Sequence, residues 1–367
     1  MTIEIINEAI EILKKYKDEG SKIVGIVQHG IFPDELVLAA GAIPLRLILG
    51  GEDEQEIGDQ YLSATTCPFG RATLGFLEKQ HPLYSLIDTM IVGTFCNGVQ
   101  NVSNYLEYFK IPSRSIIIPH SSSGLAFDYY LNELHQLKNY LEQLTGNKIT
   151  TKNILVAIKE YNQLRSLFRE INDFRKNPNP PVCGQTIHQL VCQALLLGPK
   201  YMIPKLQNVL QQLEDSPSNH SGTRIFLTGS VITLGDHLIK TIEELCGGLI
   251  VADDLCTSTD YFLEDVDITD SDPFRALATR YLCRNLCGRM IPDSRIPTIL
   301  NLYREFRAYG IINHTLKFCD SYSNLKTDFR KEMANKNIPV LDLDRDYAES
   351  TTGQIQTRIE AFLEMID

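Results

Sequence analysis

Eight short, unbroken apolar runs recur along the chain, and segments with helical periodicity alternate with them. Such runs are typical of strands that are buried on both faces of a sheet. They span residues 22–28, 43–49, 88–95, 115–119, 223–230, 249–255, 310–318 and 338–343. The alternation predicts an α/β protein with two Rossmann-like, doubly wound parallel sheets.

The helical pattern dominates between the two groups of strands and is broken at Asn177-Pro-Asn-Pro-Pro181. We therefore predict an N-terminal helix and first α/β domain over 1–123, a bridging helical region over 124–215 and a second α/β domain over 216–367. The two domains are expected to face each other across a cleft. The acidic segment 51–59 is expected to be a solvated loop.

The two halves also resemble each other, because Phe95-Cys96 and Phe318-Cys319 each end a predicted strand and precede a helix and a further strand. We interpret this as a duplication within the chain.

Charge and composition exclude several classes of partner. The 367 residues carry a net charge of −11 without any Lys/Arg-rich run, so nucleic acid and anionic membranes are poor candidates. The first 20 residues predict an amphipathic helix that lacks the apolar core of a signal peptide. No apolar run reaches the length of a membrane span. We expect a cytoplasmic protein, in which the nine cysteines are free thiols or metal ligands.

Six cysteines lie at or just beyond the predicted strands. Cys96, Cys256 and Cys319 directly follow strands, and the other three, Cys67, Cys283 and Cys287, lie in segments that begin or form a helix. Ligands of open α/β sheets gather at the carboxyl ends of the strands, so all six thiols could line one cleft. The remaining cysteines fit ordinary buried positions: Cys183, Cys192 and Cys246.

The segment Arg280–Met290 is predicted to be helical, which would place Cys283 and Cys287 on one face, a turn apart. Its three arginines, Arg280, Arg284 and Arg289, would lower the pKa of both thiols and favour the thiolate that binds metal.

Any one of these cysteines, taken alone, fits a core position better than a ligand position. Six cysteines at or just beyond strand ends, distributed over both halves, favour metal binding. Zinc is disfavoured because no Cys-x-x-Cys pair is present, whereas iron–sulfur clusters accept thiolates from scattered positions. Six thiolates suit two four-iron cubanes, or one cubane with unrelated thiols.

Other chemistry has less support in the sequence. It contains no P-loop, dinucleotide fingerprint, His-Glu-x-x-His or Gly-x-Ser-x-Gly motif. His29 follows a strand and is a possible proton donor in the cleft, whereas His314 lies within a strand and is expected to be a core histidine.

Four short motifs around these cysteines extend a similarity over nearly the whole chain. They are Cys67-Pro-Phe-Gly70, Thr94-Phe-Cys-Asn97, Asp253-Asp-Leu-Cys-Thr257 and Lys317-Phe-Cys-Asp320. In these motifs the chain resembles the superfamily of 2-hydroxyacyl-CoA dehydratase and benzoyl-CoA reductase subunits. Dehydratases of that superfamily hold one [4Fe-4S] cluster on three cysteines, which the resemblance maps onto Cys67, Cys96 and Cys319.

The additional trio, Cys256 with Cys283 and Cys287, is similar to that of the double-cubane cluster proteins of the same superfamily. The resemblance implies an [8Fe-9S] cluster in which two cubanes share a sulfide and are held by six cysteines. It also implies a homodimer that works under anaerobic conditions. This homodimer would receive low-potential electrons from a separate ATPase reductase, which carries its own [4Fe-4S] cluster. The implied reaction is reduction of small molecules such as acetylene, hydrazine or azide.

Two alternatives remain at this stage. In the first, the chain is one subunit of a 2-hydroxyacyl-CoA dehydratase with a single cubane, acting on an acyl-CoA with an unlike second subunit. In the second, it is an electron-storage module without catalytic activity. Whether Cys283 or Cys287 is a spectator also remains open.

Overall fold

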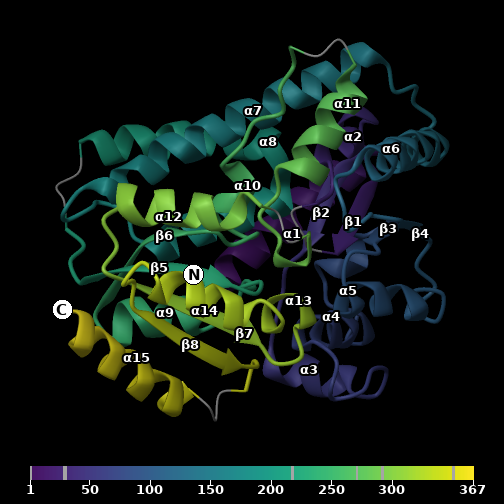
Figure 1. Cartoon of the computed structure of the whole chain (residues 1–367). Coiled ribbons are helices and arrows are strands. Elements are labelled where there is room, and N and C mark those ends of the chain that lie inside the picture. Colours follow the sequence, from purple (N-terminus) through teal and green to yellow (C-terminus); the bar gives the residue numbers. More distant parts are fainter. Residues whose placement is uncertain (1, 28–30, 216–218, 270–271, 291–292, 349–351) are drawn as a thin grey trace.

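Two four-stranded parallel sheets with the same strand order form the framework of the computed structural model (Figure 1). It describes residues 2–27, 31–215, 219–269, 272–290, 293–348 and 352–367. The first sheet has the order β2-β1-β3-β4 and the second β6-β5-β7-β8. The strands are β1 Ile23–Val27, β2 Ile43–Leu47, β3 Thr89–Gly93, β4 Ser113–Ile116, β5 Thr223–Gly229, β6 Gly248–Asp253, β7 Gly310–Leu316 and β8 Val340–Arg345. All eight predicted strands are confirmed, although β4 begins and ends earlier than predicted.

Helices cover both sheets and connect them. The α-helices are α1 Thr2–Asp18, α2 Asp34–Ala39, α3 Glu52–Gly58, α4 Pro68–Glu78, α5 Asn97–Gln100, α6 Gly124–Thr145, α7 Thr151–Asp173, α8 Gly184–Glu214, α9 Leu238–Lys240, α10 Thr259–Phe262, α11 Pro273–Ala278, α12 Arg295–Glu305, α13 Asp320–Ser323, α14 Lys326–Ala334 and α15 Thr352–Ile366. Shorter 3₁₀ turns are η1 Tyr84–Leu86, η2 Asn101–Tyr105, η3 Phe174–Lys176 and η6 Gly288–Met290, and π turns are η4 Thr241–Leu245 and η5 Thr279–Cys283. No helix in the described ranges combines the length and apolar character that crossing a bilayer requires.

Two predictions of local structure were wrong. The acidic segment after β2 forms α3 instead of a loop, because its buried residues Gln55 and Gly58 face α4 while the carboxylates stay outside. The segment 280–290 is not one helix: the π turn η5 ends at Cys283, and the 3₁₀ turn η6 begins only at Gly288.

The long helices α7 and α8 run across the molecule beside both sheets (Figure 1). Helix α8 contacts β2 of the first sheet and β6 of the second. It changes direction at Gly198, whose φ of +68° is open to glycine, directly before Pro199. These contacts give the two sheets a shared helical layer.

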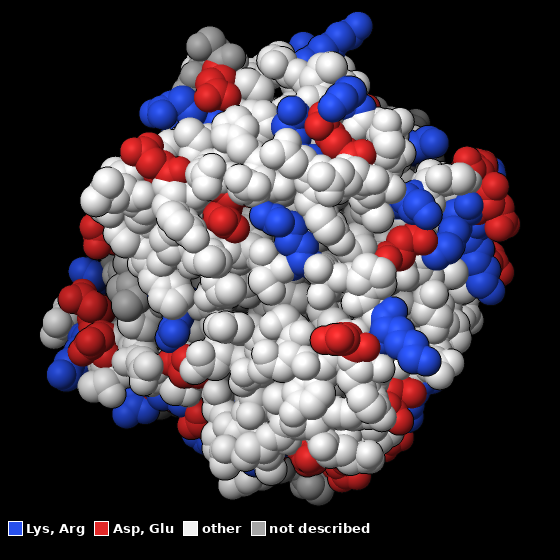
Figure 2. Space-filling model, turned by 90° about the vertical axis from the view of Figure 1, so that its right-hand side faces the viewer, with Lys and Arg blue, Asp and Glu red and all other residues white. Residues whose placement is uncertain are grey.

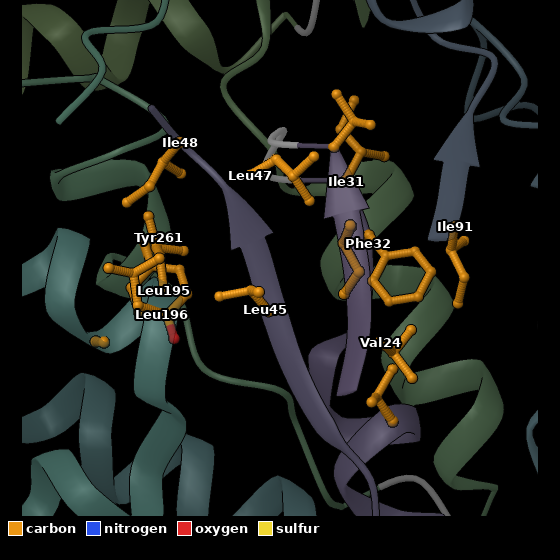
Figure 3. Close-up of a cluster of buried hydrophobic side chains, with 14 of the residues drawn as sticks. Val24, Ile31, Phe32, Leu45, Leu47, Ile48, Ile91, Leu195, Leu196 and Tyr261 are labelled. Atoms are coloured by element: carbon orange, nitrogen blue, oxygen red, sulfur yellow. The ribbon is translucent and has the colours of Figure 1, made fainter. Parts of the chain in front are cut away.

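The core of the first sheet includes residues from the second half of the chain. Ile31 and Phe32 lie between β1 and β3, whereas Tyr261 packs with Leu195 and Leu196 on the outer side of β2 (Figure 3). Because Tyr261 follows β6 in sequence, the segment after β6 reaches across to the first sheet.

The sheets also meet directly through backbone. Leu49 and Leu234 form an isolated parallel bridge, in which the Leu234 amide donates to the Ile48 carbonyl at 2.8 Å. Next to the bridge, Gly50 lies so close to Thr233 and Tyr347 that a side chain at this position would collide with both. The carboxyl ends of β2 and β5 are therefore held side by side.

Buried charge also joins the helical layer to the second sheet. Arg175 in η3 is completely buried and pairs with Asp253 at the end of β6, with 3.2 Å between Nη2 and Oδ2. Removing one partner of a buried pair leaves the other charge without compensation.

We predict that Arg175→Met lowers the free energy of unfolding by about 3 kcal/mol, because the Asp253 carboxylate would remain buried. A urea titration followed by circular dichroism measures this change. The matched control is Arg169→Met, since Arg169 pairs with the half-exposed Asp265 at 2.8 Å. That variant should lose about 1 kcal/mol or less, and equal losses in both variants would contradict the prediction.

Candidate thiol cluster at the carboxyl ends of the strands

Three cysteines occupy the same local position, the residue directly before a helix. Cys67, Cys96 and Cys319 are the N-cap residues of α4, α5 and α13. In each case a backbone amide two or three residues further on, such as that of Phe69 for Cys67, hydrogen-bonds the sulfur and lowers its pKa. Amides aimed at a sulfur stabilise negative charge on it, whether that charge belongs to a thiolate or to a metal-bound thiolate.

Two glycines bring Cys67 and Cys96 together. Gly70 and Gly98 are in such close backbone contact that a Cβ at Gly70 would collide with the Gly98 carbonyl. A Cβ at Gly98 would lie 2.8 Å from the Cys67 Cβ and 3.5 Å from its Sγ. The glycines of the two motifs therefore allow the starts of α4 and α5 to touch. Both glycines are visible in the sequence, but their role becomes clear only in the folded structure, where the two helix starts meet.

Cys319 joins this pair from the second sheet. The negative charges of Cys319 and Cys96 both raise the pKa of Cys67, which shows that the three sulfurs lie within electrostatic range of one another. The Ser230 hydroxyl at the end of β5 hydrogen-bonds Cys319 and lowers its pKa. The structure thus brings together the first predicted trio.

A fixed loop after β6 carries Cys256. The Asp253 carboxylate accepts hydrogen bonds from the Leu255 amide at 3.3 Å, the Thr259 amide at 2.9 Å and the Ser258 hydroxyl at 3.0 Å. Cys256 lies inside this loop and is only 7% exposed. The loop places it near Cys287, since the charge of Cys256 raises the pKa of Cys287.

The start of α13 links Cys287 to the first trio. A Cβ at Gly288 would lie 3.3 Å from the Tyr322 ring and 3.4 Å from the Ser321 carbonyl. Arg289 pairs with Asp320, the residue after Cys319, at 3.0 Å. In addition, the charge of Cys287 raises the pKa of Cys96. Cys287 therefore stands between the two groups of thiols.

Cys283 lies apart from the other five thiols. Burial raises its pKa and Arg284 lowers it, with no contribution from another thiol in the described ranges. The predicted common helical face for Cys283 and Cys287 does not exist, because the chain leaves the helical conformation between them.

The predicted lowering of the thiol pKa by arginines is confirmed only for Arg284 at Cys283, and burial outweighs it there. Burial raises the pKa of Cys96 to about 12 and dominates for Cys67, Cys283, Cys287 and Cys319 as well. Arg280 instead donates to the carbonyls of Asp260 and Glu264. Without metal these thiols are protonated at neutral pH, so metal binding must release their protons.

The cation that does approach the thiols was not predicted. Arg295 is 5% exposed, pairs with Asp254 at 2.9 Å and lies within electrostatic range of Cys287. Arg295 comes after Cys287 in the sequence, and no recognisable motif links the two residues. It supplies positive charge on the buried side of the cluster.

Of the two histidine predictions, one is confirmed and the other is not tested. His29 lies outside the described residues. His314 is completely buried in β7, which lowers its pKa to about 3 and confirms a core histidine. His120 follows β4, and its Nε2 lies 3.0 Å from the carbonyl of Phe95, the residue before Cys96. It is a histidine near Cys96 that we did not predict.

The remaining cysteines lie elsewhere in the fold. Cys183 precedes α8 and contacts the Thr186 hydroxyl at 3.4 Å, whereas Cys192 is buried in α8 beside His188. Cys246 lies 3.8 Å from the Gln356 carbonyl. All three fit the packing role that was expected of them.

Within the described ranges, no three His, Cys, Asp or Glu side chains lie close enough to hold a single metal ion. A four-iron cubane is wider than one ion, so its thiolates stand further apart.

We predict that Gly98→Ala separates Cys67 from Cys96 and lowers the free energy of unfolding by about 1–3 kcal/mol, because its Cβ overlaps Cys67. Urea titration measures the loss. Gly124→Ala is the control, since a Cβ at Gly124 meets nothing within 4 Å. A Gly98→Ala variant as stable as the Gly124→Ala variant would show that the close approach is unimportant.

Three relatives cover nearly the whole chain. The chain is 26% identical over 360 residues to the putative dehydratase subunit YjiM of Escherichia coli, spanning 95% of this chain and 93% of the relative. It is 25% identical to the beta subunit of (R)-2-hydroxyglutaryl-CoA dehydratase of Acidaminococcus fermentans, covering 97% and 95%. It is also 25% identical to a benzoyl-CoA reductase subunit of Thauera aromatica, covering 93% and 89%.

A family model described as 2-hydroxyglutaryl-CoA dehydratase, D-component, matches residues 30–366. That match includes all six cysteines of the predicted cluster and every strand except β1, and it agrees with the superfamily expected from the four cysteine motifs. The chain therefore belongs to the family of 2-hydroxyglutaryl-CoA dehydratase D-components.

Proposed function

We propose that this protein is an iron–sulfur reductase with a double-cubane [8Fe-9S] cluster. Cys67, Cys96 and Cys319 hold the first cubane, and the second is held by Cys256, Cys283 and Cys287. A separate ATP-hydrolysing reductase with its own [4Fe-4S] cluster supplies low-potential electrons. The observation that carries the proposal is the packing of Gly288 and Arg289, directly after Cys287, against the start of α13, which follows Cys319 and so links the two groups of thiols.

The donor set fits iron–sulfur chemistry most closely at the first trio. Each of its thiols receives backbone amide hydrogen bonds, which are known to tune cluster potentials. In the second trio, Cys256 and Cys287 fit equally well, because both are buried and near each other. For Cys283 to be the third ligand, its side chain would need to turn toward Cys256 and Cys287.

When bound, such a cluster supplies electrons one at a time at low potential. The chain's own groups would then have distinct tasks. Arg295 compensates negative charge beside Cys287. His120 holds a proton next to Cys96, because its Nε2–H donates to the Phe95 carbonyl. The buried apolar core of the first sheet excludes water from the side of the site that faces this sheet.

A cavity next to the bridge between the two sheets favours a small substrate. Its volume is about 320 Å³, and its lining includes Gly50, Asp236, Arg345 and Tyr347. Tyr347 lies within electrostatic range of Cys67, although none of the six cysteines is among the described lining residues. The volume is at the lower limit of ligand pockets and suits a molecule such as hydrazine, azide or acetylene better than a CoA thioester.

The second candidate is a subunit of a 2-hydroxyacyl-CoA dehydratase with a single [4Fe-4S] cluster on Cys67, Cys96 and Cys319. The separate position of Cys283 favours it, because a complete second trio is then absent. Two relatives are named as a dehydratase subunit, and a third is named as a subunit of benzoyl-CoA reductase. Iron content separates the two candidates.

Iron, acid-labile sulfide and zinc per chain should be measured on protein purified without oxygen. We expect about eight irons for the double cubane. About four irons would favour the dehydratase subunit, and zinc or no metal would contradict both candidates.

Three variants refine the same measurement. Cys256→Ser and Cys283→Ser should each lose about half of the iron if the trios are separate sites. Cys192→Ser, at a buried thiol in α8, should keep all of it. Full iron retention in Cys283→Ser alone would identify Cys283 as a spectator, and retention in Cys256→Ser would exclude that residue as a ligand.

We further propose that two copies associate through the face that carries Cys67 and Cys96. Segments 61–70, 89–106 and 115–127 contain no Lys, Arg, Asp or Glu, and Figure 2 shows large uncharged areas on the side of the molecule that lies to the right in Figure 1. They expose apolar side chains, since Leu125 is 88% exposed and Ile117 is 48% exposed. Since each copy carries −11, an uncharged face lets two copies meet without repulsion.

Sedimentation equilibrium should give twice the chain mass of 41.5 kDa. Leu125→Glu should shift the protein toward the monomer, because it would bury a carboxylate in each half of the interface. Met365→Glu on α15 is the control, since this residue is also exposed, at 66%, but far from the uncharged face. A monomeric wild type, or equal effects of both substitutions, would refute this interface.

A further inference from the structure

Three buried side chains form a closed ring of hydrogen bonds. The Glu35 carboxylate accepts from Arg165 Nη2 at 2.6 Å and from the Tyr281 hydroxyl at 2.7 Å. Arg165 Nη2 also donates to the Tyr281 oxygen at 3.0 Å. Glu35 and Arg165 are at most 1% exposed and Tyr281 is 5% exposed. Nothing in the proposed reaction uses these groups.

The ring joins three parts of the chain that are far apart in sequence. Glu35 lies in α2 of the first α/β unit, Arg165 in the long helix α7 and Tyr281 in the π turn η5. Turn η5 belongs to the second half of the chain and leads to Cys283 and Cys287. The ring therefore fastens the cysteine-bearing segment to the first half of the molecule.

Hydrogen bonds continue from Tyr281 to Cys287. The Asn285 side-chain amide donates to the Tyr281 and Leu282 carbonyls, both at 3.0 Å. The Asn285 Oδ1 then accepts from the Cys287 amide at 3.1 Å. An unbroken path thus runs from Glu35 through Tyr281 and Asn285 to the backbone of Cys287.

The chain between η5 and η6 depends on these hydrogen bonds, because it has no regular secondary structure of its own. A π turn is rare in proteins, and between η5 and η6 no helical hydrogen bonds hold the described chain. Asp260, which accepts from the Leu286 amide at 3.2 Å, is the other buried side chain that holds this loop in the described ranges.

We infer that the Glu35–Arg165–Tyr281 ring positions Cys287 against the thiols of the first trio. Tyr281 and Asn285 are positioning residues, and they act on the sulfur through the backbone. The inference rests on the proposed function only in treating Cys287 as a ligand. The position of the thiol itself is measurable in the full-length, metal-free protein, so the inference can fail while the iron content agrees with the proposal, and the reverse also holds.

The test is the rate at which iodoacetamide alkylates each cysteine of the full-length protein after iron removal, resolved by peptide mass spectrometry. Tyr281→Phe removes one hydroxyl and keeps the Glu35–Arg165 ion pair, so the variant should fold. We expect alkylation of Cys287 to become about three- to tenfold faster, as the loss of one hydrogen bond would allow, while Cys192 reacts at the wild-type rate.

Tyr130→Phe is the matched control. Tyr130 is also completely buried, and its hydroxyl donates to the Ile31 carbonyl at 3.2 Å, but it makes no hydrogen bond to the Tyr281–Cys287 path among those described. This variant should leave the rate at Cys287 unchanged. Equal acceleration by Tyr130→Phe, or faster alkylation of Cys192 in Tyr281→Phe, would show general loosening and overturn the inference.

Asn285→Ala interrupts the same path one step later and gives a second, independent measurement. It should accelerate the alkylation of Cys287 as Tyr281→Phe does, and the double variant should be little faster than either single one, because the two side chains act in series. An unchanged rate at Cys287 in both single variants, or accelerations that multiply in the double variant, would refute a single positioning path.

Discussion

The direct backbone contact between the two sheets determines where everything else in this protein lies. At the parallel bridge of Leu49 and Leu234, strand ends from both halves meet side by side. In a parallel sheet all carboxyl ends point to one edge, so joining two such edges gathers the connecting loops of both sheets. Gly50 is required at the bridge because Thr233 and Tyr347 leave no room for a side chain. Thiols that are far apart in sequence come together as a result.

Charge is arranged around this junction in two different ways. The long helices and the turn between them carry buried arginines, such as Arg165 and Arg175, that meet carboxylates from other elements and lock distant segments together. The thiols, in contrast, are surrounded by backbone amides and by one buried cation, Arg295. Burial alone would keep the thiols neutral, so the site is suited to sulfurs that lose their protons only when metal arrives.

The framework could be predicted well from the sequence, and the details of the site less well. Continuous apolar runs identified all eight strands because a parallel sheet covered on both faces tolerates little else. The helix predicted from Arg280 to Met290 was wrong. The composition of this segment suits a helix, but the Asn285 side chain hydrogen-bonds the backbone on both sides and the helix ends there. Arg295 could not have been found, because its proximity to Cys287 depends on long-range packing. The glycines that bring Cys67 and Cys96 together were visible, but their role requires both helices in place.

The shared strand order has a consequence for the symmetry of the site. Cys96 and Cys319 follow the third strand of their sheets, and each precedes a four-residue helix. Cys67 and Cys256 follow the second strand of their sheets. Each sheet therefore contributes one thiol after its second strand and one after its third, four thiols in all, which is the number that one cubane needs. Cys283 and Cys287 both lie in the segment between β6 and β7, so the asymmetry of the site comes from this segment alone.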